Sequence, residues 1–204
     1  MTIGDGVLVA QGDTWRVTRW WLPPRPIGLR PPPADVIRDA TALLDVSGRF
    51  RVAATGLLAD DSASRWCGVP TLRQSYDGLV PAALIGAGPG LTPAGDDLIA
   101  GALVTAHATA DPRLATWQQC VRELLTAGRT TAVSRAILHC ALDGYSTSEL
   151  ADYVRVLCDE GTAHTRRDLV RATRNLLAVG HSSGAALMSG VLHTLTTTRM
   201  RGAA

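Results

Sequence analysis

The sequence contains no lysine, since all 20 basic residues among its 204 residues are arginines. Without lysine the chain has no side-chain amine that can form a Schiff base with a carbonyl substrate or with pyridoxal phosphate. The phosphate-binding loop GxxxxGK[ST] is excluded for the same reason. Two broad classes of enzyme chemistry can therefore be set aside before any motif is considered.

Strong charge and long apolar runs are also missing. The formal net charge is +2, so no field steers the chain toward nucleic acid or a membrane surface. No run approaches the roughly 18 apolar residues of a transmembrane helix, and the first residues lack the basic and apolar regions of a secretory signal. We therefore expect a cytoplasmic protein that binds neither nucleic acid nor membrane.

Cysteine is sparse, and the cysteines are not spaced as in a CxxC metal-binding motif. The four cysteines are far apart, without a CxxC pair: Cys67, Cys120, Cys140 and Cys158. In a chain of this length without a secretory signal they are expected to be reduced thiols, mostly in the core.

The order of patterns along the chain predicts an α+β fold, with a small N-terminal β-containing region followed by a mainly α-helical C-terminal domain. Residues 1–33 are expected to form a β-hairpin, with its turn at Gln11–Asp13, and a proline-rich linker over residues 22–33 that acts as an extended spacer. Residues 34–78 are expected to form a small α/β region that begins with a helix over 34–46. Residues 79–204 are expected to form the helical domain, with helices near 93–109, 112–126, 131–142, 147–159, 163–178 and 184–197.

The most informative segment is a glycine-rich turn that leads into a helix, GAGPGLTPAGDD from residue 86. Glycines before a helix leave backbone N–H groups bare, and with the helix dipole these groups form a seat for an anion. We expect Thr92 to cap the helix, and the backbone around Gly88, Gly90 and Gly95 to hold phosphate or carboxylate with it. The segment lacks the third glycine of a dinucleotide fingerprint, because Leu91 stands there.

Two adjacent carboxylates, Asp96 and Asp97, follow in the first turn of that helix. In one interpretation they only complement the helix dipole. In the other, at least one of them is catalytic, transferring a proton or holding Mg²⁺ against an anionic substrate. Because adjacent helical residues point in different directions, we expect one carboxylate to face the site and the other to brace the loop.

The pattern G-x-x-L-[IM]-[AS]-G-[AV]-L occurs at residues 95–103 and again 89 residues later, at 184–192. Glycine inside a helix costs about 1 kcal/mol relative to alanine, so it is usually kept where another backbone comes close. We therefore predict a tight helix crossing at Gly101 and Gly190, with both helix N-termini at one end forming a single anion pocket.

Polar side chains near the second tip and at a third helix start extend this candidate pocket. His181 is a candidate to exchange a proton with the bound anion, or it only ends the loop. The third helix start provides a further wall for the anion, or it is a solvated helix end. The candidate substrate contacts from these two segments are Ser182, Ser183, Gly184, Thr131 and Ser134.

Three blocks carry a family resemblance: LIGAGPGLTPAGDDLIAG at 84–101, the Thr/Ser helix start at 130–135, and GHSSGAALMSGVL at 180–192. They resemble, in the same order, a bacterial family that includes one subunit of oxamate carbamoyltransferase from anaerobic allantoin degradation. The resemblance implies carbamoyl transfer between oxalurate and phosphate, giving oxamate and carbamoyl phosphate, in a hetero-oligomeric complex with other subunits. The sequence departs from the family pattern at Ala94, where serine is common, and at Ala185 and Ala186, where a polar residue is common.

Three functional readings stay open at this point. The chain is an enzyme subunit that binds a small anion such as phosphate, carbamoyl phosphate or an oxamate-like carboxylate. Alternatively, it is a non-catalytic structural or regulatory subunit whose glycines serve helix packing alone. A third alternative is a nucleotide-binding protein without a P-loop.

Overall fold

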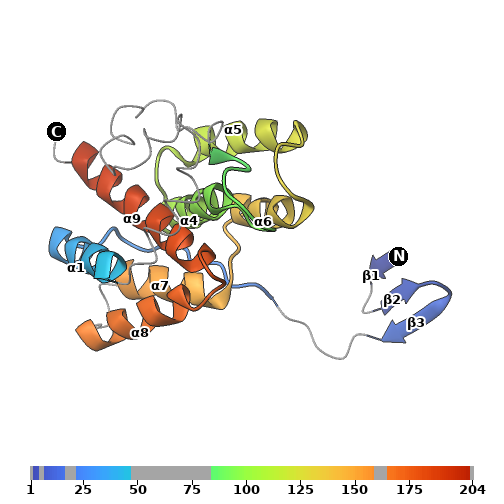
Figure 1. Cartoon of the computed structure of the whole chain (residues 1–204), viewed down its shortest axis with the longest axis horizontal. Coiled ribbons are helices and arrows are strands. Elements are labelled where there is room, and N and C mark those ends of the chain that lie inside the picture. The colour runs from blue at the N-terminus through green and yellow to red at the C-terminus, as the bar shows by residue number, and fades with distance from the viewer. Residues whose placement is uncertain (1, 5–6, 17–21, 47–83, 159–164, 203–204) are drawn as a thin grey trace.

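A computed structural model describes residues 2–4, 7–16, 22–46, 84–158 and 165–202. The described chain is mainly helical, with a small antiparallel sheet near the N-terminus that stands apart from the helical body (Figure 1). This confirms the predicted α+β fold class with a mainly α-helical C-terminal part.

The N-terminal sheet has three short strands in chain order: β1 (Thr2–Gly4), β2 (Val7–Ala10) and β3 (Asp13–Arg16). β2 and β3 are joined by Gln11 and Gly12, which have φ angles of 53° and 90°. Positive φ at both central residues is the geometry of the tight turn that matches the twist of a hairpin. The predicted hairpin is confirmed, and β1 is an additional strand too short to give a sequence pattern.

All seven predicted helices are present in the described residues, with bounds within a few residues except at the last one. Gly128, Gly144 and Gly180 follow α5, α6 and α8 with positive φ, a conformation that ends a helix. The helices are α1 (Ala34–Val46), α4 (Ala94–Ala108), α5 (Leu114–Thr126), α6 (Ala132–Leu142), α7 (Ser148–Cys158), α8 (Arg166–Leu177) and α9 (Ser183–Gly202). None of them is long and apolar enough to cross a membrane, as far as the described residues extend.

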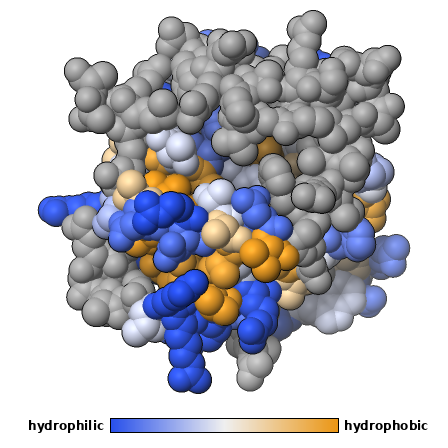
Figure 2. Space-filling view, turned by 60° about the vertical axis from the view of Figure 1, so that its left-hand side comes forward, coloured by the Kyte–Doolittle hydropathy of each residue, from blue (hydrophilic) through white to orange (hydrophobic). Residues whose placement is uncertain are grey.

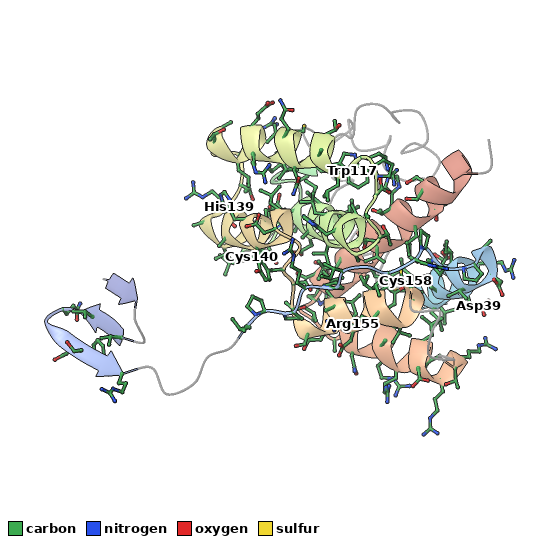
Figure 3. All side chains as sticks on the ribbon, turned by 180° about the vertical axis from the view of Figure 1, so that it is seen from behind. Asp39, Trp117, His139, Cys140, Arg155 and Cys158 are labelled. Atoms are coloured by element: carbon green, nitrogen blue, oxygen red, sulfur yellow. The ribbon has the colours of Figure 1, made fainter. Side chains whose placement is uncertain are left out.

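The last helix, α9, continues beyond the predicted end at residue 197 because its threonines are held by a buried ion pair. Arg113 and Asp111 pair at 2.5 Å, and the Arg113 guanidinium also donates to Thr197 and Thr198. The guanidinium lies 4.6 Å from the centroid of the Trp117 ring (Figure 3). Threonine has a poor helix propensity, and these contacts compensate for it.

The centre of the molecule is the crossing of α4 and α9, which pack against each other more extensively than any other described pair of helices. A Cβ atom at Gly101 would lie 2.2 Å from the backbone oxygen of Leu187, and one at Gly190 would lie 2.1 Å from that of Leu98. Each glycine thus receives the backbone of the other helix. The predicted tight crossing is confirmed.

The two crossing helices repeat each other beyond the glycines. Thr105 donates to the carbonyl of Gly101 at 2.8 Å, and Thr194 donates to the carbonyl of Gly190 at 3.0 Å. These pairs are again 89 residues apart in the chain. The two segments are therefore similar in structure as well as in sequence, because each helix has a glycine and a threonine at equivalent positions with the same hydrogen bond.

Helix α1 packs against α8 and α9, although the sequence analysis assigned it to a separate region. Its buried residues Ile37, Ala40 and Leu44 belong to the same hydrophobic cluster as the core of the crossing helices. The boundaries at 33 and 78 stay predictions, because residues 47–83 lie outside the described part. On the face shown in Figure 2, hydrophobic and hydrophilic residues of the described chain lie side by side.

The proline-rich segment 22–33, which we call the proline strap, is extended and carries no helix or strand. It is bonded to the helical body, because Ser146 N donates to the carbonyl of Pro24 at 3.0 Å and Leu29 N to that of Ala108 at 2.8 Å. The guanidinium of Arg25 lies 5.6 Å from the centroid of the Tyr145 ring. The predicted extended conformation is confirmed, and the helical body holds the strap along its surface (Figure 3).

The cysteines are less buried than predicted. Cys158 on α7 is buried, Cys120 is half-buried, and Cys140 on α6 is exposed. All three are free thiols (Figure 3 labels Cys140 and Cys158). The expectation of core positions is confirmed for Cys158 and wrong for Cys140, and Cys67 lies outside the described residues.

Candidate functional site

The N-termini of α4 and α9 meet at one end of their crossing, as the repeated pattern predicted. The hydroxyl oxygens of Thr92, before α4, and Ser183, the first residue of α9, are 3.1 Å apart. Thr92 was expected to cap α4, and this is wrong: the helix has no side-chain cap, and the carbonyl of Pro93 accepts from the amides of Asp96 and Asp97 instead. The Thr92 hydroxyl is thereby left for the contact between the two tips.

A cavity of about 510 Å³ lies beside this contact, between α4, α6, α7 and the turn before α9. Thr92, Asp97 and Ser183 contribute polar atoms to its wall, and side chains such as Ile137 and Leu187 make the rest of the wall apolar. Within the described residues, the wall includes no arginine and no histidine. The cavity therefore offers hydroxyl groups and one carboxyl group, without a positive side chain.

Asp96 is the brace of the glycine-rich turn. Its Oδ1 accepts the Gly86 amide at 2.8 Å, and its Oδ2 accepts the hydroxyl of Thr130 in the loop before α6. Only 2% of Asp96 is exposed to solvent. Because both oxygens are engaged within the protein, Asp96 joins the turn to the start of the neighbouring helix.

Asp97 is as buried as Asp96, but it lines the cavity and one of its oxygens lacks a partner in the described structure. It is 4% exposed, lines the cavity, and its Oδ2 has no hydrogen-bond partner within the described part of the chain. Burial raises the pKa of Asp97 to about 6, partly opposed by the Ser183 hydroxyl; the negative charge of Asp96 raises it further and the Thr92 hydroxyl lowers it. The predicted division between one bracing and one site-facing carboxylate fits this geometry.

The arrangement of the two carboxylates bears on the expected Mg²⁺ site. A shared ion would need Asp96 to give up its hydrogen bonds to Gly86 and Thr130. Among the described residues there is no group of three or more His, Cys, Asp or Glu side chains placed to hold a metal. Asp97 is therefore the carboxylate of this pair that remains available to a ligand of any kind.

Two of the glycines expected to offer bare amides do not offer them. The Gly95 amide donates to Ala87 and the Gly184 amide to Val179, both at 2.9 Å. At each of these glycines a Cβ would come within 2.0 Å of a backbone carbonyl oxygen. They serve close packing, and the expectation of free N–H groups there is wrong.

The free amides lie earlier in the glycine-rich turn. The amides of Gly88, Gly90 and Thr92 make no backbone hydrogen bond within the described ranges. Gly90 is exposed, and its φ of 94° is a conformation that glycine adopts without strain. These donors stay candidates for an anion at the rim of the site.

The other residues predicted for the site differ in burial and in their contacts. Thr131 caps α6 by accepting the Ser134 amide at 3.1 Å, and its hydroxyl donates to the carbonyl of Leu91 at 2.5 Å. Ser134 is buried, and its hydroxyl oxygen has no partner among the described residues. His181 is exposed and Ser182 half-buried in the turn before α9. In the described structure none of these four lines the cavity.

The opposite wall of the cavity is formed by residues that no sequence motif indicated. The residues Tyr145, Ser146 and Thr147 after α6 line it, together with Cys140 and with Pro23 of the proline strap. A turn of small hydroxyl residues between two helices was visible in the sequence, but nothing placed it near the glycine-rich turn. Only the packing of α6 and α7 against α4 brings these segments together.

A family model described as oxamate carbamoyltransferase subunit AllH matches residues 84–195, more than half of the chain. The chain belongs to this family. The match spans both glycine-led helix tips and confirms the resemblance drawn from the three sequence blocks. The AllH family is described as a subunit, which implies a multi-subunit enzyme. No solved structure matches the chain significantly.

The bracing role of Asp96 predicts a loss of stability in Asp96→Asn. The new amide group cannot accept both hydrogen bonds, so one half-buried donor loses its partner at a cost of about 2 kcal/mol. In a chain of this size the melting temperature is expected to fall by roughly 4–8 °C. The control is Asp39→Asn on the exposed face of α1 (Figure 3), for which thermal denaturation is expected to give no change. Equal melting curves for both variants would contradict the brace.

Proposed function

We propose that this chain is the subunit of a carbamoyl-transferring enzyme that holds a small anionic carbamoyl compound at the junction of α4 and α9. The observation that carries the proposal is the meeting of the two helix N-termini at Thr92 and Ser183, on the wall of a cavity. Family membership supplies the substrate class, because the AllH family is described by its action on oxamate.

The distribution of charge supports one orientation of the ligand. The described cavity wall has no positive side chain, so it suits the uncharged carbamoyl end. The charged end belongs at the rim, where the amides of Gly88, Gly90 and Thr92 are free of backbone partners and the dipoles of two helices favour an anion. His181 and Ser182 are at the surface on the second tip and would contact the same end.

The proposed reaction is carbamoyl transfer from oxalurate to phosphate. A phosphate oxygen attacks the carbamoyl carbon, the bond from that carbon to the oxamate nitrogen breaks, and the nitrogen accepts a proton as oxamate leaves. Carbamoyl phosphate is the other product. A group with a pKa near working pH is the best proton donor, and the pKa of Asp97 at about 6 supports it in this role.

Ligand-dependent thermal stability of the full chain tests this function. Phosphate, carbamoyl phosphate, oxamate and ATP are added separately, with and without Mg²⁺. Oxamate or carbamoyl phosphate at one hundred times its Kd should stabilise the folded state by about 2.7 kcal/mol, which corresponds to a shift of roughly 5–10 °C. The double variant Thr92→Val with Ser183→Ala should lose the shift, and Thr126→Ala, at an exposed position on α5, should keep it.

Each other outcome of the same experiment favours an alternative. A shift with ATP but not with phosphate, oxamate or carbamoyl phosphate indicates the nucleotide-binding protein. No shift with any compound, together with loss of folding in the double variant, indicates the structural or regulatory subunit. Either result overturns the proposal of a carbamoyl site.

A further inference from the structure

We propose that Asp97 determines specificity, by accepting a hydrogen bond from the –NH₂ group of a primary carboxamide and rejecting a carboxylate in its place. This inference rests on the proposed function and assigns a role within the same site. The ligand class that follows is a short compound with an uncharged carboxamide at one end and an anionic group at the other.

The first argument is the free oxygen of Asp97. Its Oδ2 is buried and lacks a hydrogen-bond partner in the described structure, whereas both oxygens of Asp96 are satisfied by the protein. A buried oxygen without a hydrogen-bond donor destabilises the folded protein until a ligand supplies one. An ionised carboxylate only accepts hydrogen bonds, so the matching ligand atom must carry a hydrogen.

The second argument is the pair of hydroxyl groups next to it. Thr92 and Ser183 are 3.1 Å apart, and both line the cavity with Asp97. Each hydroxyl carries one hydrogen, and in this contact one hydroxyl donates to the other. The second hydroxyl keeps its hydrogen for Asp97 or, when a ligand is bound, for the carbonyl oxygen of that ligand. A carboxamide presents a donor and an acceptor side by side, which is the complement of one carboxylate beside two hydroxyl groups.

The third argument is charge. The described wall contains no arginine or histidine that could offset a second carboxylate. A dicarboxylate would place a negative charge beside that of Asp97 in a largely apolar space, where repulsion is stronger than in water. Replacing a matching hydrogen-bond donor by an unmatched group in such a site costs far more than a change of size, which is how polar sites achieve specificity.

Calorimetric titration of the full chain at pH 7.5 tests the inference with three compounds. Oxamate carries the –NH₂ group, oxalate replaces it with a charged oxygen, and N,N-dimethyloxamate keeps the charge but removes both hydrogens. The native chain should bind oxamate at least tenfold more tightly than either of the others. Asp97→Asn should bring oxamate and oxalate within threefold of each other, because the new side chain donates to oxalate.

Asp96→Asn is the matched control, because it removes the same charge from the adjacent residue without changing the group that lines the cavity. It should be less stable yet keep the tenfold preference for oxamate. Equal binding of oxamate and oxalate by the native chain overturns the inference and leaves the proposed function intact. An unchanged preference in Asp97→Asn has the same consequence. Failure of all three compounds and of carbamoyl phosphate to bind overturns the proposed function, and the inference with it.

Discussion

Gly190→Ala is expected to destabilise the protein by about 3 kcal/mol or more. The added Cβ would lie 2.1 Å from the backbone oxygen of Leu98 and 2.8 Å from the backbone nitrogen of Ala102. Backbone atoms cannot rotate away as a side chain can, so α4 and α9 must separate along their whole contact. Helix propensity alone predicts the opposite sign, a gain of about 1 kcal/mol for alanine over glycine.

Chemical denaturation monitored by circular dichroism measures this effect. Ala115→Gly, at an exposed position of α5, is the control for propensity and should cost about 1 kcal/mol. Gly101→Ala should behave like Gly190→Ala, because its Cβ would lie 2.2 Å from the Leu187 oxygen. The double variant should cost less than the sum of the two, since one widening of the crossing accommodates both methyl groups. A stabilised Gly190→Ala variant would show that the helices do not approach this closely.

Asp97→Asn is expected to stabilise the protein, by about 2–3 kcal/mol at pH 7.5. The folded-state pKa of Asp97 is about 6, against 3.8 for an unperturbed carboxyl, so the native state resists ionisation of this group. The native chain therefore loses stability as the pH rises from about 4 through 6, at about 1.4 kcal/mol for each unit of pKa difference. An asparagine does not ionise, so the variant escapes this loss.

The pH dependence separates this explanation from a general effect of charge. The difference between Asp97→Asn and the native chain should be close to zero at pH 4, grow between pH 4 and 6, and stay constant above. Urea denaturation at pH 4, 5, 6, 7 and 8 measures it. Asp96→Asn, by contrast, should be destabilised, because that carboxylate is hydrogen-bonded by Gly86 and Thr130. A destabilised Asp97→Asn at pH 7.5 would contradict the account of a buried carboxylate that resists ionisation and has one oxygen without a hydrogen-bond partner.

Ionisation of Asp97 thus lowers the stability of the folded protein at the candidate site. A carboxyl group that weakens the fold when it is ionised, lines a cavity and has one oxygen without a partner in the described structure is typical of a functional site. The same variant that gains stability should lose the preference for oxamate. Opposite effects of one substitution on stability and on selectivity would be difficult to obtain from a residue with a packing role alone.

Local patterns in the sequence determined the helical elements. The apolar spacing and the glycine and proline punctuation predicted α1 and α4 to α8 within a few residues, because these signals act within one or two turns of the chain. Only α9 was underestimated, since the ion pair of Asp111 and Arg113 that supports its last turns comes from the loop before α5. The β2–β3 hairpin was visible from its turn for the same local reason.

The close approach at Gly101 and Gly190 was also predictable from the amino-acid pattern, because glycine inside a helix has a cost that packing must offset. What it left open was which of the paired carboxylates faces the site, which glycine amides are free, and what forms the far wall of the cavity. These points depend on helix packing, since each involves a partner distant in the chain: Thr130 for Asp96, Ser183 for Thr92, and Tyr145 with the proline strap for the wall. Hydrogen bonding and burial are properties of the assembled fold, and a pattern of residue types along one segment does not contain them.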